Sequence, residues 1–205
     1  MNRILFTCLL LLLIAGTLTG QTTDQSYTGC NLVREKAPAI RGIKLGMTSD
    51  ELYAVVPGIG ENYKAVMVRA RNFPQFGFVS LSANSIDGDK FNGIEGLNFS
   101  LFDDHVVEYR IYYRGPNSVP RGPYWPNGDD LIARFADAYH LPGPANWAGG
   151  YGTGSKLLRC KGFEVRVMTT TNPQIIVGEP GTPWVAEQKK RREAFEEQLR
   201  RDFKP

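Results

Sequence analysis

Few side chains in this 205-residue chain stand at spacings that catalysis or metal binding would need. The histidines are His105 and His140. His105 follows Asp103 and Asp104, a set that could bind a metal or exchange protons, but adjacent turn residues point in divergent directions. We therefore interpret them as a solvated turn. His140 ends a predicted helix, where a positive side chain suits the helix dipole.

Two segments have part of a ligand-binding pattern. Residues 87–89 (Asp-Gly-Asp) begin like a calcium loop, but Phe91 and Asn98 stand where that loop needs an oxygen ligand and a bidentate glutamate. Residues 149–156 have the glycines of a phosphate-binding loop, yet the lysine follows the serine and a strand is predicted next. No Gly-x-Ser-x-Gly nucleophile motif occurs. We expect no catalytic residue, no metal and no cofactor.

The first 20 residues have the pattern of an export signal. Arg3 supplies a positive charge, Ile4 to Ala15 is apolar, and small or hydroxylated residues follow. The apolar run is about 12 residues, whereas a membrane span needs roughly 20. We predict that residues 1–20 are a cleaved signal peptide, that no stable membrane span remains, and that the mature protein is periplasmic or secreted.

The cysteines fit that location. Cys8 lies in the predicted signal peptide, so Cys30 and Cys160 remain in the mature chain. In an exported protein we predict that they form a disulfide, and two unpaired thiols are the alternative. Closing so long a loop would contribute roughly 4–5 kcal/mol in the chain-entropy model. The disulfide would also remove both thiols from nucleophilic catalysis.

Charge and composition exclude some classes of partner. The chain has 24 basic and 21 acidic side chains, and loss of Arg3 leaves 23 − 21 = +2. This charge is too small to indicate nucleic-acid binding. Apolar residues make up 42% and charged residues 22%, which is typical of a globular domain.

Local patterns in the first half predict a helix followed by strands. Thr48 and Glu51 form a capping box, flanked by a hydrophobic staple of Met47 and Leu52, so a helix should open at Ser49. The helix should end at residues 57–58 (Pro-Gly). Alternating apolar residues predict strands in 76–83, 97–101 and 107–113. The last two should form a hairpin around a turn of residues 103–105, with Glu108 and Arg110 facing outward.

The second half repeats this order. Residues 116–127 are a Pro/Gly connector, and a helix follows from 128 to a stop at 142–144. Its predicted apolar side has Leu131, Ile132, Phe135, Ala138 and Tyr139. Strands are predicted in 156–160, 163–167 and 174–177, and residues 179–183 are a predicted breaker.

The C-terminal segment, residues 184–205, is a predicted charged helix. Phe195, Leu199 and Phe203 form a narrow apolar stripe, so the helix either lies on the domain surface or projects and pairs with another chain. Its predicted i, i+4 ion pairs are Glu187/Arg191, Glu196/Arg200 and Glu197/Arg201.

These elements predict an α+β fold. We expect one antiparallel sheet made of two tandem helix-plus-β-meander units, residues 36–115 and 128–183, with the helices packed on one face. A flexible N-terminal arm (21–35) would precede the units, the connector (116–127) would join them, and the C-terminal helix would follow.

The segments 42–52 (Gly-Ile-Lys-Leu-Gly-Met-Thr-Ser-Asp-Glu-Leu) and 102–106 (Phe-Asp-Asp-His-Val) carry a family resemblance. They resemble bacterial exported domains of the β-lactamase-inhibitor-like type, which are related to the small lipoprotein of the outer-membrane assembly machine. The resemblance implies a helix and a three-stranded meander, single or in tandem, that binds proteins or assists assembly in the cell envelope without enzymatic activity. The resemblance does not assign a functional residue of that family to any position of this chain.

Aromatic side chains near the connector and the glycine loop form a candidate binding surface: Tyr112, Tyr124, Trp125, Trp147 and Tyr151. Our leading hypothesis is an exported, non-enzymatic module that binds another envelope or secreted protein. The alternatives are an enzyme acting on envelope glycan or peptide with unidentified carboxylates, and a structural role of the C-terminal helix. The sequence leaves the oligomeric state open.

Overall fold

The computed structural model describes residues 30–56, 59, 78–84, 89–115, 117, 128–150, 154–169 and 172–203. The predicted signal peptide, most of the N-terminal arm and nearly all of the connector lie outside the described residues. Tyr124, Trp125 and Tyr151 of the candidate surface also lie outside them.

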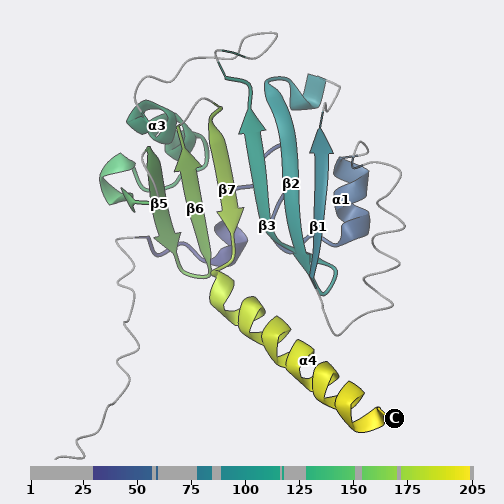
Figure 1. Cartoon of the computed structure of the whole chain (residues 1–205). Coiled ribbons are helices and arrows are strands. Elements are labelled where there is room, and N and C mark those ends of the chain that lie inside the picture. Colours follow the sequence, from purple (N-terminus) through teal and green to yellow (C-terminus); the bar gives the residue numbers. More distant parts are fainter. Residues whose placement is uncertain are drawn as a thin grey trace, which may run out of the picture.

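The fold is α+β, with one seven-stranded antiparallel sheet in the order β1-β2-β3-β7-β6-β5-β4 (Figure 1). The strands are β1 (Phe78–Asn84), β2 (Ile94–Phe102), β3 (His105–Tyr113), β4 (Ala148–Gly149), β5 (Ser155–Cys160), β6 (Phe163–Met168) and β7 (Gln174–Gly178). The α-helices are α1 (Ser49–Val55), α3 (Gly128–Ala138) and α4 (Gly181–Asp202). Short 3₁₀ turns occupy Arg34–Lys36, Asp89–Phe91 and Pro144–Asn146.

Helix α1 begins where the sequence predicts. The Thr48 amide donates to Glu51 Oε2 at 2.9 Å, and the Glu51 amide donates to Thr48 Oγ1 at 3.3 Å, which completes the predicted capping box. The segment before the helix pairs with the start of β3, since the Gly46 amide donates to the Val106 carbonyl and the Val106 amide to the Met47 carbonyl, both at 2.8 Å. These bonds fix α1 against the sheet.

The β2–β3 hairpin is also confirmed, with a shorter turn. Asp103 and Asp104 both have positive φ (48° and 66°), as two-residue hairpin turns require for their twist to match the strands. His105, which we assigned to the turn, is the first residue of β3. Strands β5, β6 and β7 also form as predicted, whereas the two-residue β4 was not predicted.

One face of the sheet packs with α1 and α3 in a single hydrophobic cluster. Tyr109, Ile111 and Val165 are completely buried on this face. In α3 the expected Ala138 is exposed and Ala136 is buried instead, because residue 136 lies one turn after the buried Ile132.

Helix α4 begins at Gly181, before the predicted start. Pro183 is its third residue, and a proline is tolerated in the first turn because no amide there needs an intrahelical acceptor, so residues 181–183 do not break the helix. The predicted Glu187–Arg191 and Glu196–Arg200 pairs form, at 2.9 and 3.7 Å. No described helix is both long and apolar enough to cross a bilayer.

Helix α4 starts at the end of the sheet where β7 ends, and its second half projects away from the sheet (Figure 1). Its first half contacts the end of β2 and the β2–β3 turn. Arg191 contacts both carboxylate oxygens of Asp103, at 2.6 and 2.8 Å, and its guanidinium lies 5.1 Å from the ring centre of Phe102. The hydrogen bond to Asp103 is the main cause that raises the pKa of Arg191. Leu199 in the second half and Phe203 just after the helix are 54% and 73% exposed.

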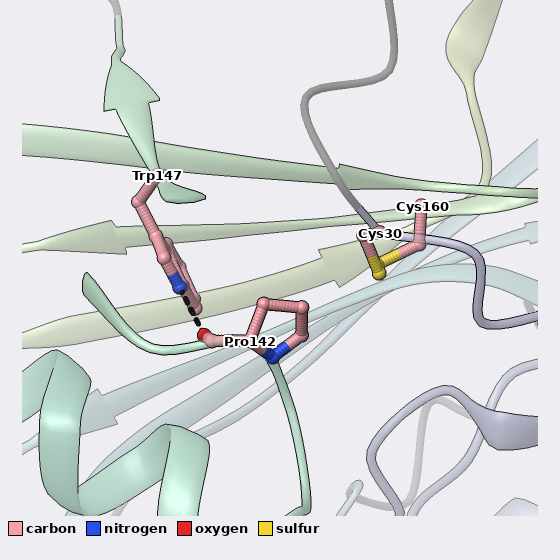
Figure 2. Close-up of a disulfide and its surroundings, with 4 residues drawn as sticks. All are labelled: Cys30, Pro142, Trp147 and Cys160. Carbon is pink, nitrogen blue, oxygen red and sulfur yellow. Dashed lines mark hydrogen bonds between the residues drawn. A yellow bond between two sulfur atoms is a disulfide. The ribbon is translucent and has the colours of Figure 1, made fainter. Parts of the chain in front are cut away.

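The predicted disulfide is present: Cys30 and Cys160 are bonded, with their Cα atoms 4.7 Å apart (Figure 2). Both residues are buried. The bond joins the first described residue to the end of β5. A parallel bridge from Val33 to Lys161 and an ion pair between Arg34 and Glu179 extend this attachment.

Candidate functional site on the polar face of the sheet

The sheet face opposite the core carries ordered rows of polar side chains, because alternate residues of a strand point to opposite faces. The strand register gives three rows over the central strands β3, β7 and β6, and we call this surface the polar face. The rows are Glu108–Gly178–Glu164, Arg110–Ile176–Arg166 and Tyr112–Gln174–Met168.

Two of these strands, β3 and β6, carry the same Glu-x-Arg pattern, and they run in the same direction. In β3, Glu108 Oε1 lies 3.8 Å from Arg110 Nη2, and in β6, Glu164 Oε1 lies 3.0 Å from Arg166 Nη2. These four side chains keep between 24% and 34% of their surface exposed. The polar face therefore presents an acidic row beside a basic row, and each charge is already partly balanced by its neighbour.

The middle strand separates the charged side chains. A Cβ atom at Gly178 would lie 3.3 Å from Glu108 Cγ, so the glycine gives this carboxylate room. Ile176 is only 3% exposed although it lies on the polar face. Its register neighbours are Arg110 and Arg166, and the methylene stems of arginine cover apolar surface in this way. The Nε atoms of both arginines are buried, with no hydrogen-bond partner in the part of the chain that the structure describes.

A polar hollow of about 390 Å³ adjoins the charged rows. It is lined by Ser82, Glu95, Gly96, Asn98, Tyr112 and Asn172. Asn98 Nδ2 donates to Tyr112 Oη at 3.1 Å, and Asn172 Nδ2 donates to Glu95 Oε2 at 2.9 Å. Arg110 Nη1 lies 3.5 Å from Tyr112 Oη, which connects the hollow to the basic row.

Other tyrosines belong to the core side of the sheet. Tyr109 is completely buried and its hydroxyl donates to the Pro38 carbonyl. Burial raises the pKa of Tyr109 well above its usual value and that of Tyr113 to about 12. Burial also raises the pKa of Tyr139, which stacks near Phe135 with ring centres 4.8 Å apart. These phenols serve packing and stay protonated at neutral pH.

The described members of the aromatic candidate surface lie on different sides of the sheet. Tyr112 is on the polar face, half-buried. Trp147 is 5% exposed, and its Nε1 donates to the Pro142 carbonyl at 2.9 Å (Figure 2). The Trp147 side chain is therefore part of the hydrophobic core.

Sequence reasoning placed Glu108 and Arg110 outward but did not assign them to a site. It also missed Glu164, Arg166 and Asn98. The Glu-x-Arg pattern, which occurs in both predicted strands, was the available indication. The pattern alone could not show that β7 would lie between the two strands and bring their side chains into common rows.

The histidines do not contribute to this surface. His105 is exposed, and its Nδ1 lies 2.8 Å from the Asp103 carbonyl oxygen. Among the described residues, no three His, Cys, Asp or Glu side chains converge as a metal site would require. No family model matches the chain, and no curated protein or solved structure is significantly similar to it.

Proposed function

We propose that the protein is an exported, non-enzymatic binding module of the bacterial cell envelope, and that its polar face recognises another envelope or secreted protein. The observation that carries the proposal is the ordered pair of charged, partly exposed rows on the side of the sheet opposite the core. The hydrophobic core lies on the opposite side of the sheet, so the charged ends of these side chains lie outside it.

The partner is a folded protein with a complementary order of charges. Basic side chains of the partner would face Glu108 and Glu164, and acidic ones would face Arg110 and Arg166. Complementary charges of this kind fix the register of a complex and exclude wrong partners.

An enzyme acting on envelope glycan or peptide is the alternative, and Glu108 and Glu164 would be its candidate carboxylates. Each lies beside an arginine that holds it as an ion pair, and the two stand on either side of Gly178. Ion pairing of both carboxylates favours charge recognition over proton transfer, so binding is the preferred role.

We also propose that the protein is built from two tandem β-lactamase-inhibitor-like units, residues 36–115 and 128–183. Helix α1 precedes β1, β2 and β3, and helix α3 precedes β5, β6 and β7. The last strands of the two series, β3 and β7, are antiparallel neighbours at the centre of the sheet. The order of elements and the central junction support two like units joined side by side.

A site-directed photo-crosslinker tests the proposed surface. The crosslinking residue p-benzoylphenylalanine replaces Met168 on the polar face, and a control carries it at Tyr53, which is 40% exposed on α1. In envelope extract, we expect one product from position 168 that an excess of the unlabelled protein suppresses and that position 53 does not give. The crosslinked protein is then purified and its affinity measured.

The double variant Arg110→Glu/Arg166→Glu supplies the decisive comparison. We expect it to bind the purified partner at least about tenfold more weakly, because it places acids where the partner presents acids. Equal crosslinking from both positions, or unchanged affinity of the folded double variant, would refute the proposed surface.

A further inference from the structure

The polar hollow is formed where a β-bulge interrupts β2. Ile94 pairs with Tyr113 and Gly96 pairs with Tyr112, so Glu95 is an extra residue in this strand. A bulge redirects side chains, and such irregularities are frequent beside functional sites. Here the exposed Glu95 lines the hollow with its carboxylate, and Gly96 lines it without adding a side chain.

The walls of the hollow come from separate elements and are held in place by their own hydrogen bonds. Asn98 of β2 is bound to Tyr112 of β3, and Asn172 before β7 is bound to Glu95. A carboxamide has two donor hydrogens and an acceptor oxygen, so each amide keeps capacity for a ligand after one such bond. The polar groups are thus oriented before any ligand arrives.

The lining indicates the class of ligand. Hydrophobic ligands occupy sites lined mainly by apolar side chains, whereas Tyr112 supplies the only aromatic ring among these lining residues. Glu95 is the only charged side chain among these lining residues, which disfavours an anionic ligand, and its Oε2 already accepts a hydrogen bond from Asn172 Nδ2 at 2.9 Å. Its volume of about 390 Å³ is within the range of ligand pockets, roughly 300–1,000 Å³.

We infer that the polar hollow binds a neutral saccharide unit. The sugar places an apolar ring face against Tyr112 and its hydroxyl groups against the amides of Asn98 and Asn172 and the hydroxyl of Ser82. This ligand goes beyond the proposed protein partner and does not depend on it.

Titration of the full-length protein with cellobiose, maltose and N,N′-diacetylchitobiose, followed by ¹H–¹⁵N NMR, tests the inference. We expect at least one disaccharide to cause saturable shifts of the Gly96, Asn98, Tyr112 and Asn172 amides, with Kd on the order of 1 mM. Asn98→Ala should weaken this binding about tenfold, because it removes an amide of the wall. Asn146→Ala changes an exposed asparagine outside the hollow and should leave the affinity unchanged.

A blocking variant keeps the test decisive if Asn98→Ala disturbs the strand. Ser82 is exposed on β1 at the rim, so Ser82→Trp fills the hollow without entering the core and should abolish the shifts. The inference is wrong if none of the three disaccharides gives saturable shifts at these amides, or if the shifts persist in Ser82→Trp. It is also wrong if N-acetyl-lysine amide, a small mimic of a lysine residue in a peptide, saturates the hollow and the disaccharides do not. Arg166→Glu, which weakens the proposed protein contact, should leave saccharide binding unchanged.

Discussion

Loss of the Cys30–Cys160 disulfide should destabilise the whole fold. Two perturbations separate the effect of the cross-link from that of the sulfur atoms. Reduction of the wild-type protein removes the bond and keeps both side chains, whereas Cys30→Ala/Cys160→Ala removes the bond and the sulfur volume. Alanine introduces no polar group, which matters because the two positions are 2% and 0% exposed.

The magnitude follows from the loop that the bond closes. The cysteines are 130 residues apart, and chain entropy gives about 5 kcal/mol for a loop of that length. The whole free energy of unfolding of a domain is typically about 5–15 kcal/mol. The double alanine variant should lose on the order of 1 kcal/mol more than the reduced protein, since it leaves a small cavity at a buried site.

Urea unfolding monitored by far-UV circular dichroism measures both effects. With a slope of about 2 kcal/mol per molar urea, a loss of about 5 kcal/mol lowers the midpoint by about 2.5 M. The reduced protein should retain its secondary structure in water if its total stability exceeds that loss. Identical midpoints for the oxidised and reduced proteins would refute the reasoning, because the cross-link would then constrain only its immediate neighbourhood.

Four further predictions follow from particular contacts. Thr48→Ala should lower the free energy of unfolding in urea by about 1 kcal/mol, because it removes the side-chain acceptor of the α1 capping box. A urea midpoint equal to that of the wild type would show that the cap is dispensable. Gly46→Ala should cost about 1–2 kcal/mol, since φ is +79° and the new Cβ would lie 2.9 Å from an Arg34 nitrogen. Gly143→Ala, at φ −64° with no atom within 4 Å of its Cβ, is the matched control and should cost less than about 0.5 kcal/mol. The contribution of Tyr113 to the free energy of unfolding should be constant below about pH 10 and fall by up to about 3 kcal/mol as the pH rises to about 12, because Tyr113 ionises at a pKa of 10.0 when unfolded and about 12 when folded. The raised pKa values of Tyr109 and Tyr139 add to the loss of stability at high pH, so Tyr113→Phe should remove only the Tyr113 part. Asp103→Asn should speed hydrogen exchange in the first half of α4, because it weakens the ion pair with Arg191. The pair is partly exposed, so global stability should change by less than about 1 kcal/mol. Unchanged hydrogen exchange would mean that other contacts hold the helix.

Much of the fold could be predicted because its causes are local. The capping box that starts α1 involves residues three apart, and the alternation in β2 and β3 lies within each strand. The start of α4 was missed because Pro183 was interpreted as a breaker, although its position in the first turn makes it harmless. Trp147 packs in the hydrophobic cluster with its indole N–H bonded to the Pro142 carbonyl, an arrangement that no sequence pattern indicates.

The sequence by itself indicated the described α-helices, the described strands except β4, the apolar face of each of these strands, and the pairing of Cys30 with Cys160. The tertiary structure alone decided that β7 lies between β3 and β6, so that Glu108, Gly178 and Glu164 share a row and Arg110 and Arg166 lie on either side of Ile176. It also placed Asn172 at the bulge of β2 and so completed the hollow. The reason is physical: alternation fixes the face of a side chain within its own strand, but the neighbour and register of a distant strand depend on how the assembled core packs.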